Sequence, residues 1–150
     1  MSASTTALLT TIRTRLLDFV PADGGATLGT RLGNRLYETQ APADTLSPYG
    51  VYRLMNRIET DGFAGMRETG DVEVMLFTRP RSEAATLDAA ADVADQALLS
   101  WAQVTDGITF ARFRTRDMLP PAPDPWDREL VVVRLVFPVV VWPTYRTQYA

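Results

Sequence analysis

The segment from Arg128 to Trp142 constrains the fold more than any other part of the chain. It has the pattern of one long strand with apolar residues on both faces: Val131, Val133, Leu135, Phe137 and Val139 alternate with Val132, Val136 and Val140. A strand of this kind is buried on both sides of its sheet. Its apolar run is interrupted by Arg134 and Pro138 and is too short to span a bilayer. We therefore expect a strand whose second face is covered by something.

Four other segments have strand patterns. Tyr49 to Thr60 is rich in aromatic and aliphatic residues, and Asp71 to Arg79 alternates apolar and polar residues. Asp61-Gly62 between them is a hairpin signal, with a loop or bulge expected over 63–69. Leu32 to Glu38 and Ile108 to Arg116 complete the set of predicted strands.

Two segments have the spacing of amphipathic helices. The first covers residues 4–20 and is ended by Pro21; its stripe is Leu8, Ile12, Leu16 and Phe19. The second begins at a Ser82 cap and extends to about residue 103, where Asp106-Gly107 follows; its stripe is Leu87, Ala91, Ala94, Leu98 and Trp101. The many alanines would let this helix approach a sheet closely.

The order of these elements predicts an α+β fold in one domain over residues 1–150. We expect an antiparallel, or mixed, sheet of about four to five strands with two α-helices on one face. Residues 118–127 form an extended proline-rich loop, and residues 143–150 form a C-terminal tail. Because two helices cover only one face, we expect another copy of the chain on the second face.

Several absences from the sequence exclude classes of chemistry. The 150 residues contain no Cys, no His and no Lys, so all fifteen basic residues are Arg. Thiolate nucleophiles, Ser-His-Asp triads, Schiff-base lysines and most zinc sites are therefore excluded. The net charge of −3 argues against a dedicated nucleic-acid binder. We expect no cofactor, and an intracellular product without a secretory signal.

At four places the sequence suggests a functional site, but a structural role is the better interpretation. Gly24 to Arg31 has phosphate-loop glycine spacing but lacks the lysine, so a flexible linker is the better interpretation. Asp71 and Glu73 share a strand face, which favours a solvated face, with pairing to arginines across the sheet as a possibility, over a metal site. The carboxylates near Pro123, namely Asp124, Asp127 and Glu129, are interpreted as loop residues. The row Arg112, Arg114 and Arg116 is interpreted as an exposed strand face rather than a phosphate-binding row.

The candidate contact residues belong to the proline-rich loop, the tail and the arginine row. Trp126 in the loop is either an arm that docks on a neighbour or a cover over its own core, and the sequence leaves both open. The candidates for contacts with other subunits or partners are Leu119, Pro125, Trp126, Pro143, Tyr145, Tyr149, Arg112 and Arg114.

The order of motifs resembles the tail terminator, or tail completion, proteins of tailed bacteriophages and gene-transfer particles. The resemblance begins at Gly33-Asn34-Arg35-Leu36-Tyr37 and continues through Ala41-Pro42 to Pro48-Tyr49-Gly50-Val51-Tyr52. It includes the strand at 72–77, the alanine-rich helix from Ser82 and the apolar C-terminal strand. Gly50 departs from the family pattern, because a β-branched residue is expected there, so the strand start is expected to bulge.

This resemblance implies a structural role without catalysis. It implies a hexameric ring in the virion that caps the head-proximal end of the tail tube, stops its polymerisation and joins it to the head or neck. The implied partners are other copies of the chain, the tail tube protein and a head-completion or neck protein. Double-stranded DNA would pass through the lumen without specific binding, and no membrane is involved. Assembly would take place in the host cytoplasm.

Three alternatives stay open. The chain could be another head-tail joining protein of the neck. It could be a metal-dependent phosphodiesterase using Asp71, Glu73, Asp124 and Asp127, which magnesium or manganese calorimetry would reveal. A small ligand-binding module is the third, although no polar pocket signature supports it.

Overall fold

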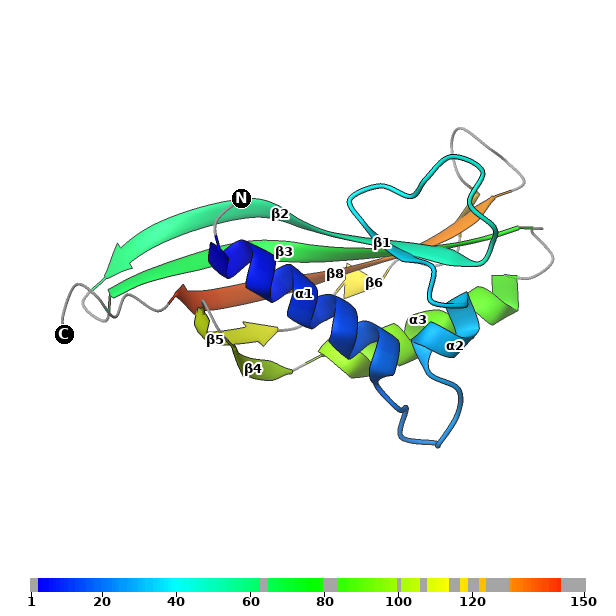
Figure 1. The fold of residues 1–150 in the computed structure, drawn as a ribbon, viewed down its shortest axis with the longest axis horizontal. Coiled ribbons are helices and arrows are strands. Elements are labelled where there is room, and N and C mark those ends of the chain that lie inside the picture. The colour runs from blue at the N-terminus through cyan, green and yellow to red at the C-terminus, as the bar shows by residue number, and fades with distance from the viewer. Residues whose placement is uncertain are drawn as a thin grey trace.

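The computed structural model describes residues 3–62, 65–79, 84–99, 101–105, 108–113, 117–118, 122–123 and 130–143. Within these ranges it describes the side chains of residues 8–55, 69–79, 85–99, 101 and 130–140. The helices are α1 (Ala3–Asp18), α2 (Leu28–Leu32) and α3 (Ala84–Leu98). The strands are β1 (Leu36–Glu38), β2 (Tyr49–Gly62), β3 (Gly65–Thr78), β4 (Ala102–Thr105), β5 (Ile108–Phe113), β6 (Asp117–Met118), β7 (Ala122–Pro123) and β8 (Val131–Pro143) (Figure 1).

The predicted α+β class with a mixed sheet is confirmed. The sheet order is β1-β2-β3-β8-β5-β4, and β6 and β7 also pair with β8. β1 runs parallel to β2, and the other pairs are antiparallel. Among the described residues the sheet has eight strands, but β1, β6 and β7 are two or three residues long. The longer strands match the number expected.

β8 lies inside the sheet, a position that the strand pattern of the sequence does not specify. One edge pairs with β3 from Val131↔Thr78 to Val141↔Glu68. The other edge pairs in turn with β7, β6 and β5. The region expected to be only an extended loop, 118–127, therefore contributes edge pairing through β7 at Ala122–Pro123. A proline is tolerated there because an edge strand need not donate on both sides.

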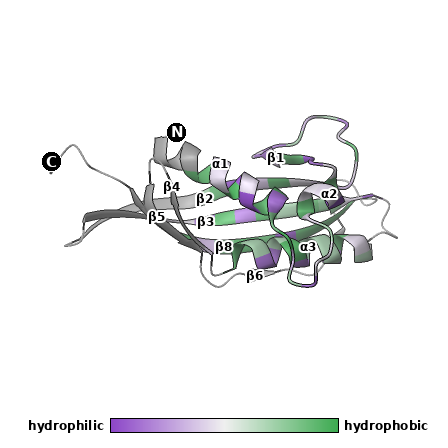
Figure 2. Ribbon diagram, turned by 60° about the horizontal axis from the view of Figure 1, so that its bottom comes forward, coloured by the Kyte–Doolittle hydropathy of each residue, from purple (hydrophilic) through white to green (hydrophobic). Residues whose placement is uncertain are grey.

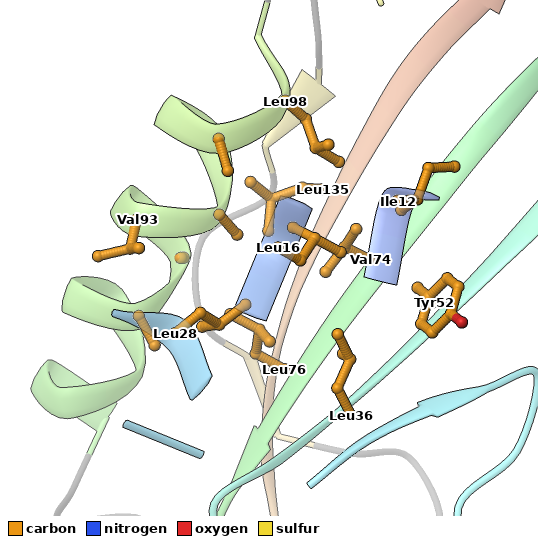
Figure 3. Packing of buried hydrophobic residues seen from close by; sticks show 14 of the residues in the cluster. Ile12, Leu16, Leu28, Leu36, Tyr52, Val74, Leu76, Val93, Leu98 and Leu135 are labelled. Atoms are coloured by element: carbon orange, nitrogen blue, oxygen red, sulfur yellow. The ribbon is translucent and has the colours of Figure 1, made fainter. Parts of the chain in front are cut away.

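The three helices pack on the same side of the sheet (Figure 2). Val72, Val74 and Leu76 of β3 are fully buried under them. They pair with Phe137, Leu135 and Val133 of β8, so these six side chains share one face. The core is closed from α1 and α3, as their spacing predicts, by Leu8, Ile12, Leu16, Leu87, Ala91, Ala94 and Leu98. Figure 3 shows Ile12, Leu16 and Leu98 among them.

The predicted end of the second helix is wrong. α3 ends at Leu98, and residues expected to be its last turn form β4, which pairs with β5. The Trp101 backbone N–H donates to the Leu98 carbonyl at 3.0 Å. β4, not a helix, therefore precedes Asp106-Gly107 in the chain. Hydrogen bonding to β5, the next strand in the chain, outweighs the helical propensity of residues 102–103.

α3 has no basic residue in its last turn, and α1 supplies one instead. Arg15 donates from Nε to the Ala97 carbonyl at 2.8 Å. Its guanidinium also lies over the rings of Phe19 and Trp101, at 4.6 and 5.3 Å from their centroids. Burial lowers the pKa of the Arg15 guanidinium from its ordinary value. This contact fixes the end of α3 against α1.

Two other local predictions are corrected. Residues 28–31, expected to be flexible linker, and Leu32, expected to begin a strand, form α2, because Thr27 caps it by accepting from the Thr30 N–H at 3.2 Å. The strand itself begins at Leu36. Gly33 ends α2 with φ +58°. β3 begins at Gly65, so the loop expected over 63–69 is mostly strand, and the register irregularity lies in β2 between Met55 and Ile58.

Within the described part of the chain, no helix is long and apolar enough to cross a membrane.

Candidate functional site

The sheet has a second face, turned away from the helices, and it is the candidate functional surface. Strand alternation places on it the odd-numbered residues of β2 as far as Met55, the odd-numbered residues of β3 and the even-numbered residues of β8. We call this surface the open face and define it by Tyr49, Val51, Arg53, Met55, Asp71, Glu73, Met75, Phe77, Val132, Arg134, Val136 and Pro138. Most of these side chains are half-buried, in contrast to the fully buried ones on the helix side.

An ion cluster occupies the centre of the open face. Glu73 of β3 is 1% exposed, although it carries a carboxylate. Arg53 of β2 donates from Nε to Glu73 Oε1 at 2.6 Å, and Arg134 of β8 donates from Nε to the other carboxylate oxygen, Oε2. Both arginine side chains are 41% exposed. The cluster therefore presents two guanidinium groups and one net positive charge.

The origin of this cluster is visible in the strand register. Arg53 is directly opposite Glu73 across β2 and β3, and Arg134 is opposite Met75, one diagonal step away from Glu73. A buried carboxylate is tolerated only when charged hydrogen bonds replace the water it has lost. The two arginines satisfy that condition from both sides.

An aromatic group lies at one end of the open face. Tyr49 and Phe77 are paired across the strands and stack with ring centroids 4.9 Å apart and planes 15° apart. The loop before β2 lies beside them, and its Ser47 hydroxyl donates to the Arg79 carbonyl at 3.1 Å.

The loop and this end of the open face enclose a depression of about 620 Å³. Its floor includes Val51, Met75 and Leu130, and Leu46 on its rim is 73% exposed. An exposed leucine beside stacked aromatic rings is typical of surfaces that contact other proteins.

The arrangement suits a contact between macromolecules. Aromatic, methionine and arginine side chains are the residues enriched in protein interfaces. A guanidinium held in place by a carboxylate loses little freedom when it binds an acidic group. The open face thus combines a fixed basic centre with an apolar end.

Most of the predicted contact residues lie outside the described residues: Leu119, Pro125, Trp126, Tyr145, Tyr149 and Arg114. The structure places the other two only by their backbone. Arg112 in β5 is paired with Val140 of β8, and Pro143 ends β8 opposite Ile108. These two residues lie at the same region of the sheet, and the roles predicted for all eight residues stay predictions.

The sequence singles out Glu73 but not its two partners, Arg53 and Arg134. The solvated face expected for Glu73 is wrong, because its side chain is 1% exposed, whereas arginine pairing across the sheet is present. A usable signal was present: one acidic and two basic residues interrupt three strands that are otherwise rich in apolar residues. Such charges inside central strands need partners.

Glu73 is not arranged as a metal ligand. Both of its carboxylate oxygens accept hydrogen bonds from arginine. Among the described side chains, no group of three His, Cys, Asp or Glu could hold a metal ion. Asp124, Asp127 and Glu129 lie outside the described residues. The segment with phosphate-loop spacing instead folds into α2, whose Arg31 donates to the Ala26 carbonyl.

No protein-family model matches the chain, and no curated protein matches it in sequence. Solved structures do match it. A chain from the virion of a native gene transfer agent (GTA) particle is 18% identical, with a TM-score of 0.64, covering 96% of this chain and 100% of that one. A second chain, whose name describes no activity, is 13% identical with a TM-score of 0.66, covering 93% and 96%. The protein thus shares its fold, along nearly its whole length, with a chain of a gene transfer agent virion.

Proposed function

We propose that the chain is a structural subunit of a virion or gene-transfer particle and performs no catalysis. The observation that carries the proposal is the shared fold over almost the full length of both chains. At 18% identity this similarity supports a shared fold. The order of motifs in the sequence independently supports a structural protein of such a particle. The open face adds a surface suited to contacts with other proteins.

More specifically, the chain forms a hexameric ring at the head-proximal end of the tail tube. The ring stops polymerisation of the tube protein and provides the joint to a head-completion or neck protein. DNA passes through its lumen without specific binding, in keeping with the net charge of −3, because DNA affinity depends on neutralising phosphates.

The experiment is electron microscopy of particles produced after the gene is disabled in its parent element. We expect tails that are abnormally long or variable in length, with full heads left unattached. Tails of normal length beside heads that leak DNA would instead place the protein in the neck.

Intact and infectious particles would overturn the assembly role. The enzyme hypothesis would then be tested by calorimetry with magnesium or manganese and by a DNA cleavage assay. Arginine pairing of Glu73 leads us to expect neither binding nor cleavage.

A further inference from the structure

We propose that the open face of one copy packs on the exposed side of α3 of a second copy. In this contact the cluster of Arg53, Glu73 and Arg134 meets Asp88 and Asp92. The inference rests on the proposed function, since a ring requires one contact that is repeated between copies. It adds which two surfaces form that contact.

The cluster at the centre of the open face favours an acidic occupant. Its two arginines share one glutamate, so these three residues carry one net positive charge, and Asp71, on the same face two residues before Glu73, has an interaction of its own. Val132 and Val136 of β8 lie on either side of Arg134 and are half-buried. A partner that covered them with apolar atoms alone would leave the guanidinium groups without compensation, which is costly.

The exposed side of α3 has the complementary charge. Asp88 and Asp92 are one helical turn apart and both exposed, and residues 84–98 include no Arg or Lys. Side chains four residues apart lie on the same helix face, with Cβ atoms about 6 Å apart. Two carboxylates are thus presented together to an approaching surface.

The exposed side of α3 also carries small side chains, which allow close packing on a sheet. Its other exposed residues include Ala85 and Ala89, which let the backbone of the helix approach. Leu99 follows the helix and is 40% exposed. It provides an apolar group at one end of the acidic row, as the aromatic pair does at one end of the open face.

The two surfaces lie on opposite sides of the molecule. α3 lies on the helix-covered side of the sheet (Figures 1 and 2). Its residues Leu87, Ala91 and Leu98 are buried in the core. Its exposed side therefore points away from the sheet, and the open face points in the other direction. A contact between different surfaces is heterologous, and it closes into a ring when each step adds a suitable rotation.

Cysteine cross-linking tests the contact, because the natural chain contains no Cys. The test chain carries Val136→Cys on the open face and Ala89→Cys on α3. Within one chain these positions lie on opposite sides, so a short bis-maleimide can join them only between copies. The matched control carries Val136→Cys with Thr14→Cys, an exposed position on α1.

We expect a ladder of covalent multimers, at least about tenfold more abundant than in the control, because an assembled contact raises the local concentration of the two thiols. The reaction is run on concentrated purified protein and on assembled particles, and a ladder in either supports the contact. No excess over the control in both would overturn it.

Charge neutralisation provides the second measurement. The double variant Asp88→Asn, Asp92→Asn in the test chain is expected to reduce the ladder about tenfold. Asp18→Asn with Asp23→Asn makes the same charge change at exposed positions elsewhere and is expected to leave the ladder unchanged. Equal reduction by both pairs would overturn the specific pairing.

These results are distinguishable from the fate of the proposed function. Abnormal tails after gene disruption, together with no ladder, would retain the function and reject this contact. A ladder together with intact particles would retain the contact and reject the tail role.

Discussion

The two faces of the sheet are formed by the same three strands, β2, β3 and β8, but they have different roles. On the helix side, successive residues such as Val72, Val74 and Leu76 are fully buried and apolar. On the open face, their immediate neighbours include a buried carboxylate, two arginines and a stacked aromatic pair. The helix side therefore stabilises the fold, whereas the open face retains chemistry suited to recognition.

The largest expected effect lies on the helix side. Phe137 is completely buried, so Phe137→Ala should lower the free energy of unfolding by about 3–5 kcal/mol. The adjacent residue on the other face, Val136, is half-buried, and Val136→Ala should cost about 1 kcal/mol. Urea denaturation followed by circular dichroism measures both. Equal losses would show that the open face is as much a core as the helix side.

The next effect lies at the centre of the open face. Glu73→Ala leaves Arg53 and Arg134 facing each other without a carboxylate and should cost about 2 kcal/mol. The figure is below that for a fully buried pair, because both arginines are partly exposed to solvent. Thermal denaturation provides the measurement, and Asp88→Ala, at an exposed carboxylate, should change stability by less than about 0.5 kcal/mol. A similar small change for Glu73→Ala would contradict the structural role of the cluster.

A stabilising substitution is expected on the helix side. Thr78 is fully buried, and its hydroxyl has no hydrogen-bond partner among the described residues. Thr78→Val keeps the shape and removes the unpaired polar group, so it should raise the free energy of unfolding by about 1 kcal/mol. Thr14→Val, on the exposed side of α1, is the control and should change stability little. A loss of stability at position 78 would indicate that the hydroxyl is satisfied in solution.

The smallest effect concerns pH. Burial raises the pKa of the Tyr52 hydroxyl above its ordinary value of 10.0. The charge of Glu38 raises this pKa further, and the charge of Arg13 lowers it. The unfolded chain then releases this proton at lower pH than the folded chain does. The contribution of Tyr52 to the free energy of unfolding is fully present below about pH 10 and decreases as the pH rises toward the pKa of the folded state. Tyr52→Phe should therefore reduce the alkaline decline in denaturation midpoint, and an identical decline would contradict the burial argument.

Periodicity predicted the elements that are long and strongly patterned. The stripes of α1 and α3 and the pairing of β2 with β3 follow from local pattern alone. Predictions were wrong where pairing between strands decides the structure. Residues 102 and 103 are expected in the helix but belong to β4, which pairs with β5, the next strand in the chain. Short elements such as α2 depend on one cap, Thr27, which was not recognised.

The sequence by itself determined that this chain builds one sheet with a helix-covered face, and that its last long strand is apolar on both faces. Those properties follow from local spacing, because burial on one side of an element repeats with that element's own period. Only the tertiary structure decided that Arg53, Glu73 and Arg134 meet. They come from three strands, and their separation depends on strand order and register, which no local pattern encodes.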